Sequence, residues 1–309
     1  MKISYYLSVI FHLNPFNNDP NRSAAEYTIK KLLAFVLIYC FSAVLGEGII
    51  IGVLYRMGYD PLHGVMPAGQ IGELLPYYGF LVFLLVTIAY CRLVEKKTMQ
   101  SIGFSGNAAD YLAGVLLAAI LLAIIIGINC ISGSMIFLEW KAKVDFESLF
   151  LWILAFGIQG AAEEMMCRGF LLHSLLEKIS IPKAVMISSS AFVLPHLMSL
   201  LEADFAYAIV GIMNLYLISI VFSMLVLRRS GLWIACGLHS AWNFILYVIM
   251  GLSLSGVEST SKGIILFGVK DAGLPNGAAY GIEAGLITTA VLGILATLIL
   301  KGWQCEKNF

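Results

Sequence analysis

The chain has 309 residues, of which 60% are hydrophobic and only 12% are charged, and its formal net charge is zero. Its mean hydropathy of +0.90 excludes an ordinary soluble globular domain, whose surface needs many more charged residues. The sequence contains no basic tract, so nucleic acid is not an expected partner. The composition instead indicates a protein that lies in the lipid bilayer.

Apolar residues occur in runs of roughly 20, the length that carries an α-helix across a hydrocarbon core about 30 Å thick. The sequence therefore predicts an all-α, polytopic transmembrane helix bundle with about eight spans. No linker, low-complexity segment or internal repeat interrupts the pattern, so residues 1–309 are expected to form a single membrane domain. The predicted spans lie near residues 32–54, 75–93, 111–132, 148–172, 183–200, 205–227, 231–250 and 278–300.

Basic residues are divided unequally between the two sides of the predicted bundle. With eight spans, both termini lie on one side, and the loops of that side hold thirteen basic residues against five in the opposite loops. Because basic loops stay in the cytoplasm, we expect an integral protein of the cell membrane with both termini cytoplasmic. The thirteen are Lys2, Arg22, Lys30, Lys31, Arg92, Lys96, Lys97, Lys178, Lys183, Arg228, Arg229, Lys301 and Lys307, and the five are Arg56, Lys141, Lys143, Lys262 and Lys270.

Few polar side chains fall inside the predicted spans, and each is costly there unless it has a partner or faces a cavity. Glu47 lies about two thirds of the way across the first span. For Glu47 we favour a contact at the membrane interface or with a local polar group, and a substrate contact is the alternative. The other polar residues are concentrated in the fourth to seventh spans: Glu163, Glu164, Arg168, His196, Asn214, His239 and Asn243.

The fourth span contains two adjacent carboxylates followed by an arginine. Glu164 and Arg168 are separated by four residues, so they share one helix face and are expected to form a structural ion pair. Glu163 projects about 100° away around the helix. Since one arginine does not satisfy both carboxylates, Glu163 is the candidate for a functional role.

Three spans bring ionisable side chains to a similar depth. At 1.5 Å per residue, Glu163, His196 and His239 lie roughly 22, 20 and 15 Å from the basic residues at the cytoplasmic ends of their helices. Independent packing residues would rarely coincide in this way, so we infer a shared intramembrane site. Asn243 follows His239 by four residues and lies on the same helix face.

At these residues the sequence resembles the CPBP family of intramembrane proteases, which includes the type II CAAX prenyl endopeptidases and the bacteriocin-processing and self-immunity proteins. The family motifs EExxxR, FxxxH and HxxxN occur in the family order, each on its own predicted span. The resemblance covers about residues 148–250, which we take as the motif-bearing catalytic core. The matching residues are Glu163, Glu164 and Arg168, then Phe192 and His196, then His239 and Asn243.

The resemblance implies a role for each motif residue. Glu163 would act as general base on a water molecule, assisted or oriented by His196. His239 and Asn243 would line an oxyanion hole. The supporting residues would be Glu164, Arg168 and Phe192, the last of which lies one helical turn before His196 and would form a wall of the pocket.

The sequence leaves two mechanisms open. Glu163, His196 and His239 form a set of two histidines and one carboxylate that is able to bind zinc with a water in the fourth position, although there is no HExxH motif. No serine or cysteine stands in a recognisable nucleophile motif, which disfavours covalent catalysis. We favour a metal-free glutamate mechanism without a cofactor, and zinc catalysis is the alternative.

These inferences predict an endopeptidase that acts on a membrane-embedded or lipidated peptide or protein, with prenylated CAAX-type proteins and leader or bacteriocin peptides as the two substrate classes. A non-catalytic bacteriocin-immunity or binding protein is the first alternative. A proton-coupled transporter is the second, because intramembrane Glu and His residues also build proton relays. The lack of repeat symmetry and the gathering of the polar groups into one cluster argue against the transporter.

Overall fold

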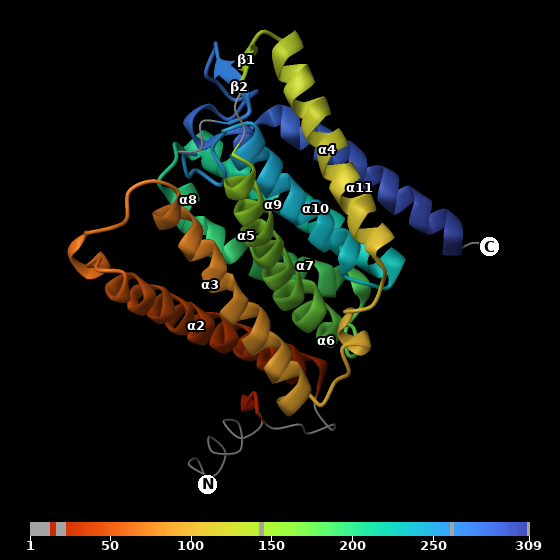
Figure 1. Cartoon of the computed structure of the whole chain (residues 1–309). Helices are drawn as coiled ribbons and strands as arrows, with labels where there is room; N and C mark the ends of the chain where they lie inside the picture. Colours follow the sequence, from red (N-terminus) through yellow and green to blue (C-terminus); the bar gives the residue numbers. More distant parts are fainter. Residues whose placement is uncertain (1–12, 17–22, 142–144, 260–262, 308–309) are drawn as a thin grey trace.

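The computed structural model describes residues 13–16, 23–141, 145–259 and 263–307, and of residues 303–307 only the backbone. These residues form a bundle of helices with one small sheet at one end (Figure 1). The α-helices are α2 (Ala24–Arg56), α3 (Gln70–Ala89), α4 (Ala108–Ile131), α5 (Phe146–Glu164), α6 (His173–Leu175), α7 (Ile181–Val193), α8 (Leu197–Leu201), α9 (Phe205–Arg229), α10 (Trp233–Phe244) and α11 (Leu286–Lys307).

Several of these α-helices continue directly into π-helical or 3-10 segments. We call each such continuous series of helical elements a helical rod. The connecting π-helical segments are Tyr90–Val94 after α3, Met165–Leu172 between α5 and α6, and Ile245–Ile249 after α10. A 3-10 turn, Leu194–His196, joins α7 to α8. The EExxxR motif therefore begins in an α-helix and ends in a π-helix, and the FxxxH motif ends in a 3-10 turn.

The predicted class, an all-α polytopic membrane bundle, is confirmed. Within the described residues, six helices are long and apolar enough to cross a membrane, and they correspond to the first six predicted spans. The last two predicted spans are shorter apolar helices, Trp233–Ile249 and Leu286–Gly302. The total of eight crossings therefore stays a prediction.

Two predicted boundaries were wrong. α11 begins at Leu286 rather than near residue 278, because Ala278–Tyr280 and Ile282–Ala284 form short 3-10 turns instead. α2 begins at Ala24 rather than near residue 32, because Ser23 caps the helix. The Ser23 hydroxyl accepts the backbone N–H of Glu26, and the Glu26 carboxylate accepts the N–H of Ser23.

The early start of α2 places two lysines, predicted to lie in a loop, inside the helix. Lys30 and Lys31 are both buried, and Lys31 pairs with Glu95 just beyond the π-helical end of the α3 rod. The Lys97 ammonium lies 2.6 Å from a carboxylate oxygen of Glu177, which follows α6. This charged cluster joins the ends of three helical rods.

The predicted orientation of the termini stays a prediction. Four basic residues that entered the count lie outside the described residues: Lys2, Arg22, Lys143 and Lys262.

The loops at one end of the bundle form a two-stranded antiparallel sheet that was not predicted. Strand β1 (Met135–Trp140) follows α4, and strand β2 (Ile265–Val269) lies in the long segment before α11. The strands pair from Met135 with Val269 to Trp140 with Ile265, with an irregularity between Phe137 and Glu139. The sheet fastens the segment that precedes α11 to the end of α4.

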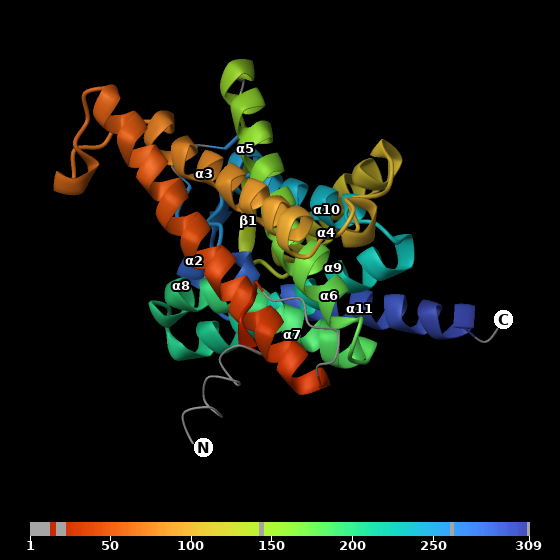
Figure 2. The same cartoon turned by 90° about the horizontal axis from the view of Figure 1, so that it is seen from below.

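α10, which carries the HxxxN motif, packs against α4, α5 and α9 (Figure 1). Figure 2 shows α2 on one side of the bundle and α11 projecting from the opposite side. Two glycines allow α10 to approach its neighbours closely. A Cβ added at Gly237 would lie 2.1 Å from the Tyr111 carbonyl oxygen of α4, and one at Gly160 would lie 2.5 Å from Ser240 Oγ of α10.

Replacing Gly237 with alanine is expected to lower the stability of the full-length protein by about 1–3 kcal/mol, because a methyl group would overlap the backbone of α4. Thermal unfolding of the protein in lipid nanodiscs would measure this effect. Gly127→Ala on α4 is the matched control, since no heavy atom of the described chain outside the surrounding turns of the same helix lies within 4 Å of the added Cβ. Equal unfolding midpoints for the two variants would contradict the prediction.

Candidate active site

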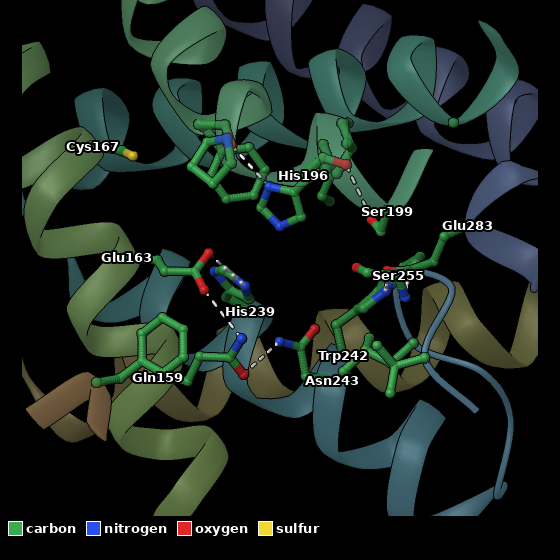
Figure 3. A pocket seen from close by; sticks show the side chains of 18 of the residues that line it. Gln159, Glu163, Cys167, His196, Ser199, His239, Trp242, Asn243, Ser255 and Glu283 are labelled. Carbon is green, nitrogen blue, oxygen red and sulfur yellow. Dashed lines mark hydrogen bonds and ion pairs between the residues drawn. The ribbon is translucent and has the colours of Figure 1, made fainter. Parts of the chain in front are cut away.

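A cavity of about 630 Å³ lies inside the bundle and is lined by residues from α2, α3, α5, α7, α9 and α10 and from the segments around them. The lining includes five of the residues predicted from the motifs: Glu163, Phe192, His196, His239 and Asn243. Figure 3 shows Glu163 and the two histidines facing one another across this space. The structure thus brings together side chains from three separate helical rods.

The Glu164–Arg168 ion pair expected from the sequence is present. Arg168 Nη1 lies 3.0 Å from Glu164 Oε1, and neither side chain is exposed. Glu164 is the last residue of α5, and Arg168 belongs to the π-helical segment that follows. π-Helical segments are rare and are frequently found at functional sites.

Arg168 is also anchored to α9 by contacts that the sequence analysis missed. Its Nη2 donates to the carbonyl and hydroxyl oxygens of Ser219, and its Nε lies 3.5 Å from Ser223 Oγ. The guanidinium carbon lies 4.7 Å from the ring centroid of Phe192 and 5.1 Å from that of Phe222. The spacing of Ser219 and Ser223, four residues apart on one face of an apolar helix, was the available signal.

His239 lies between the two glutamates. Its Nδ1 is 2.9 Å from Glu164 Oε1, and its Nε2 is 3.8 Å from Glu163 Oε2. Because the Glu164 carboxylate is paired with Arg168 and acts only as an acceptor, the Nδ1 atom donates. The Phe222 ring stacks on the imidazole at 5.1 Å. Glu164 therefore orients His239 as well as pairing with Arg168.

Glu163 projects into the cavity, where its side chain is 16% exposed. Gln159, one helical turn earlier on α5, donates from Nε2 to Glu163 Oε1 at 3.1 Å. Asn243 donates from Nδ2 to Gln159 Oε1 at 3.2 Å. Gln159 thus connects the EExxxR and HxxxN motifs, and the sequence analysis missed it because a single amide in an apolar span gives little signal.

His196 ends the 3-10 turn that joins α7 to α8. Its Nδ1 donates to the Phe192 carbonyl oxygen at 2.9 Å, which leaves Nε2 as an acceptor in the neutral ring. Figure 3 shows this second nitrogen on the side of the ring that faces Glu163 and His239. The backbone of one motif residue, Phe192, therefore sets the ring orientation of the other.

The zinc alternative requires Glu163, His196 and His239 to converge on one point as ligands. Among the residues that the structure describes, no group of three or more His, Cys, Asp and Glu side chains is arranged to hold a metal ion. Nδ1 of His239 is engaged by Glu164, so only its Nε2 is available to a ligand in the cavity. The residues as placed do not fit a zinc site.

A second acidic side chain, Glu283, lines the cavity and was missed by the sequence analysis. Its carboxylate accepts hydrogen bonds from Trp242 Nε1 at 3.0 Å and from the backbone N–H of Ser255 at 2.6 Å. Trp242 immediately precedes Asn243 on α10. Glu283 therefore holds the segments on both sides of the sheet strand β2 against the helix that carries the HxxxN motif.

Asn214 and Glu47, the remaining polar residues of the predicted spans, lie apart from the cluster of Glu163, His196 and His239. Asn214 lines the cavity, donates to the carbonyl oxygens of Glu283 and Gly285, and accepts the Thr289 hydroxyl at 2.7 Å. These contacts join α9 to the start of α11 and give Asn214 a packing role. Glu47 is exposed on α2 and does not line the cavity.

The fold and this cluster together define a polytopic membrane protein with a polar, cavity-lining cluster of Glu, His and Asn side chains. Residues 145–245, about a third of the chain, match the family described as type II CAAX prenyl endopeptidase Rce1-like. The matched stretch contains all three motifs, and the match confirms the resemblance to the CPBP family. None of the curated proteins matches the chain. The match over this part of the chain supports an intramembrane protease of the CAAX type in general.

Proposed function

We propose that the chain is an endopeptidase in which Glu163 activates water for attack on a peptide bond within the membrane. The observation that carries this proposal is the position of the Glu163 carboxylate. It faces the cavity with Oε1 held by Gln159 and with Oε2 3.8 Å from His239 Nε2. A base held in this way, next to two imidazoles and an amide donor, suits amide hydrolysis.

The reaction divides among the residues as follows. Glu163 takes a proton from a water molecule that His196 Nε2 helps to orient, and the water oxygen attacks the peptide carbonyl carbon. The resulting oxyanion accepts a hydrogen bond from the second N–H of Asn243, the first being given to Gln159. Glu163 then passes its proton to the leaving nitrogen as the C–N bond breaks, which yields a carboxylic acid and an amine.

His239 contributes to the oxyanion hole only in one protonation state. Because its Nδ1–H is given to Glu164, its Nε2 donates to an oxyanion only when both ring nitrogens carry protons. The flanking carboxylates of Glu163 and Glu164 match the charge of that imidazolium form. We therefore assign Asn243 as the constant donor and His239 as a donor in its protonated form.

A comparison of cells tests the function and searches for the substrate at the same time. Membrane-bound and released peptides would be compared by proteomics between cells that carry the wild-type chain and cells that carry Glu163→Ala. We expect cleaved membrane-associated proteins or peptides only with the wild type. Glu47→Gln, which removes an exposed intramembrane carboxylate away from the cavity, is the matched control and should behave as wild type.

The same comparison distinguishes the alternatives. A non-catalytic immunity or binding protein would keep its cellular phenotype in Glu163→Ala and His196→Ala, whereas the peptidase loses it in both. The substrate class follows from the cleaved products. Termini exposed beside a prenylated cysteine would identify CAAX-type proteins, and shortened leader segments would identify leader or bacteriocin peptides.

Metal removal is expected to leave hydrolysis unchanged. Glu163 activates water in this proposal without a Lewis acid, so exhaustive chelation of the purified full-length protein should not lower kcat. Metal analysis of the same preparation should give far less than one zinc per chain. Stoichiometric zinc together with activity that chelators remove and added zinc restores would replace the glutamate mechanism by the zinc alternative.

A further inference from the structure

Gln159 occupies a position that no motif contains, yet it contacts two motif residues. It lies on α5 one helical turn before Glu163, and its side chain lines the cavity. Its amide donates to Glu163 Oε1 at 3.1 Å and accepts from Asn243 Nδ2 at 3.2 Å. Figure 3 shows Gln159 between Glu163 and Asn243, with a dashed line to each.

The first contact restricts the carboxylate of Glu163. The terminal torsion of a glutamate side chain has a broad, roughly two-fold preference, so an unanchored carboxylate samples many orientations. The Gln159 bond holds Oε1 on the side of α5 and leaves Oε2 directed towards His239. One oxygen of the carboxylate is thereby reserved for the water that it activates.

The second contact fixes the direction of the Gln159 amide itself. An ionised Glu163 only accepts hydrogen bonds, and the Asn243 amide reaches Gln159 through its NH₂ group. Gln159 must therefore present its NH₂ group to Glu163 and its oxygen to Asn243, as the structure has it. The orientation of the Asn243 amide, and with it the remaining N–H, depends on the same side chain.

We propose that Gln159 is a positioning residue that sets the orientation of the base Glu163 and of the oxyanion donor Asn243. The inference rests on the proposed function, since both partners take their roles from it. Gln159 acts through these two residues, so its removal should slow the chemical step and leave substrate binding nearly unchanged. A residue that only fills space would not produce this separation.

Gln159→Met and Gln159→Glu test the two contacts separately. Methionine keeps the length and loses both bonds, whereas glutamate keeps an acceptor for Asn243 and replaces the amide donor to Glu163 by a second carboxyl group. We expect kcat to fall about ten- to a hundred-fold in both, as misplaced catalytic groups do, with KM within about two-fold of wild type. Gln100→Met, on the exposed surface outside the cavity, is the matched control.

A double variant tests the coupling to Asn243. If Gln159 acts partly through Asn243, the loss in Gln159→Met with Asn243→Ala will be smaller than the product of the two single losses. Wild-type kcat in Gln159→Met, or a loss confined to KM, would overturn the positioning role. Activity retained by Glu163→Gln would instead overturn the proposed function, so the two failures are distinguishable. Unfolding midpoints of all variants would show whether they fold.

Discussion

Glu163→Gln is expected to lower kcat for peptide hydrolysis by about 10²–10⁴-fold, the contribution of a general base, while the protein folds as wild type. Glutamine has nearly the same size and keeps an oxygen that accepts the hydrogen bond of Gln159. Its amide is not a base, so it takes no proton from water. Turnover of a membrane-associated peptide by the full-length protein in nanodiscs would measure the loss.

Two controls separate the loss of the base from damage to the bundle. The unfolding midpoint of Glu163→Gln should equal that of the wild type, because the side chain is partly exposed to the cavity. Glu47→Gln removes another intramembrane carboxylate and should keep full activity. Wild-type turnover by the Glu163→Gln protein would contradict the glutamate mechanism, whatever effects substitutions of the other motif residues have.

The sequence predicted the helices well because the bilayer leaves few choices. A chain in hydrocarbon must satisfy its backbone hydrogen bonds within each segment, so long apolar runs become helices. The ends were harder to predict. α2 begins at the Ser23 cap and therefore includes Lys30 and Lys31. Hydropathy places charged residues such as these in a loop, because it takes no account of their burial in the folded protein.

The sheet was missed for a different reason. β1 and β2 are short, and the residues that pair between them are more than a hundred positions apart in the sequence. Period-two alternation is weak in β1, where Met135–Trp140 is nearly all apolar. The pairing of β1 with β2 depends on the tertiary contacts that bring the end of α4 next to the segment before α11. These contacts cannot be predicted from the local sequence of either strand.

The main side chains of the site were predicted because charge is costly in lipid. Glu163, Glu164 and Arg168, and the two motif histidines, stand out against an apolar background. Gln159, Ser219 and Ser223 do not stand out in this way, since neutral polar side chains are common in membrane helices. Their contacts became visible only when α5, α9 and α10 were placed side by side.

The role of Glu164 was only half predicted. Spacing along one helix indicated the pair with Arg168, but no spacing rule connects α5 to His239 on α10. One oxygen of Glu164 serves both partners, and the other, Oε2, is buried without a hydrogen-bond partner in the described chain. The stability of the buried Glu164 carboxylate therefore depends strongly on Arg168 and His239.

Arg168→Met is expected to destabilise the protein by about 3–5 kcal/mol, the usual cost of breaking a buried ion pair from one side. The variant leaves the Glu164 carboxylate buried without its cation and removes the donor that Arg168 provides to the carbonyl and hydroxyl oxygens of Ser219. Thermal unfolding of the full-length protein in nanodiscs would show the loss. Arg229→Met is the matched control, because the Arg229 side chain is exposed and its pair with the partly exposed Asp110 should contribute at most about 1 kcal/mol.

The double variant Glu164→Gln with Arg168→Met should recover much of the stability that Arg168→Met loses, because it removes the uncompensated charge as well as its partner. Glutamine at position 164 keeps an oxygen that accepts His239 Nδ1–H, so the imidazole retains its orientation. If catalysis needs only that orientation, activity will return with stability. Recovery of stability without activity would show that the negative charge of Glu164 itself is required. An Arg168→Met protein as stable as Arg229→Met would contradict the dependence of this cluster on its ion pair.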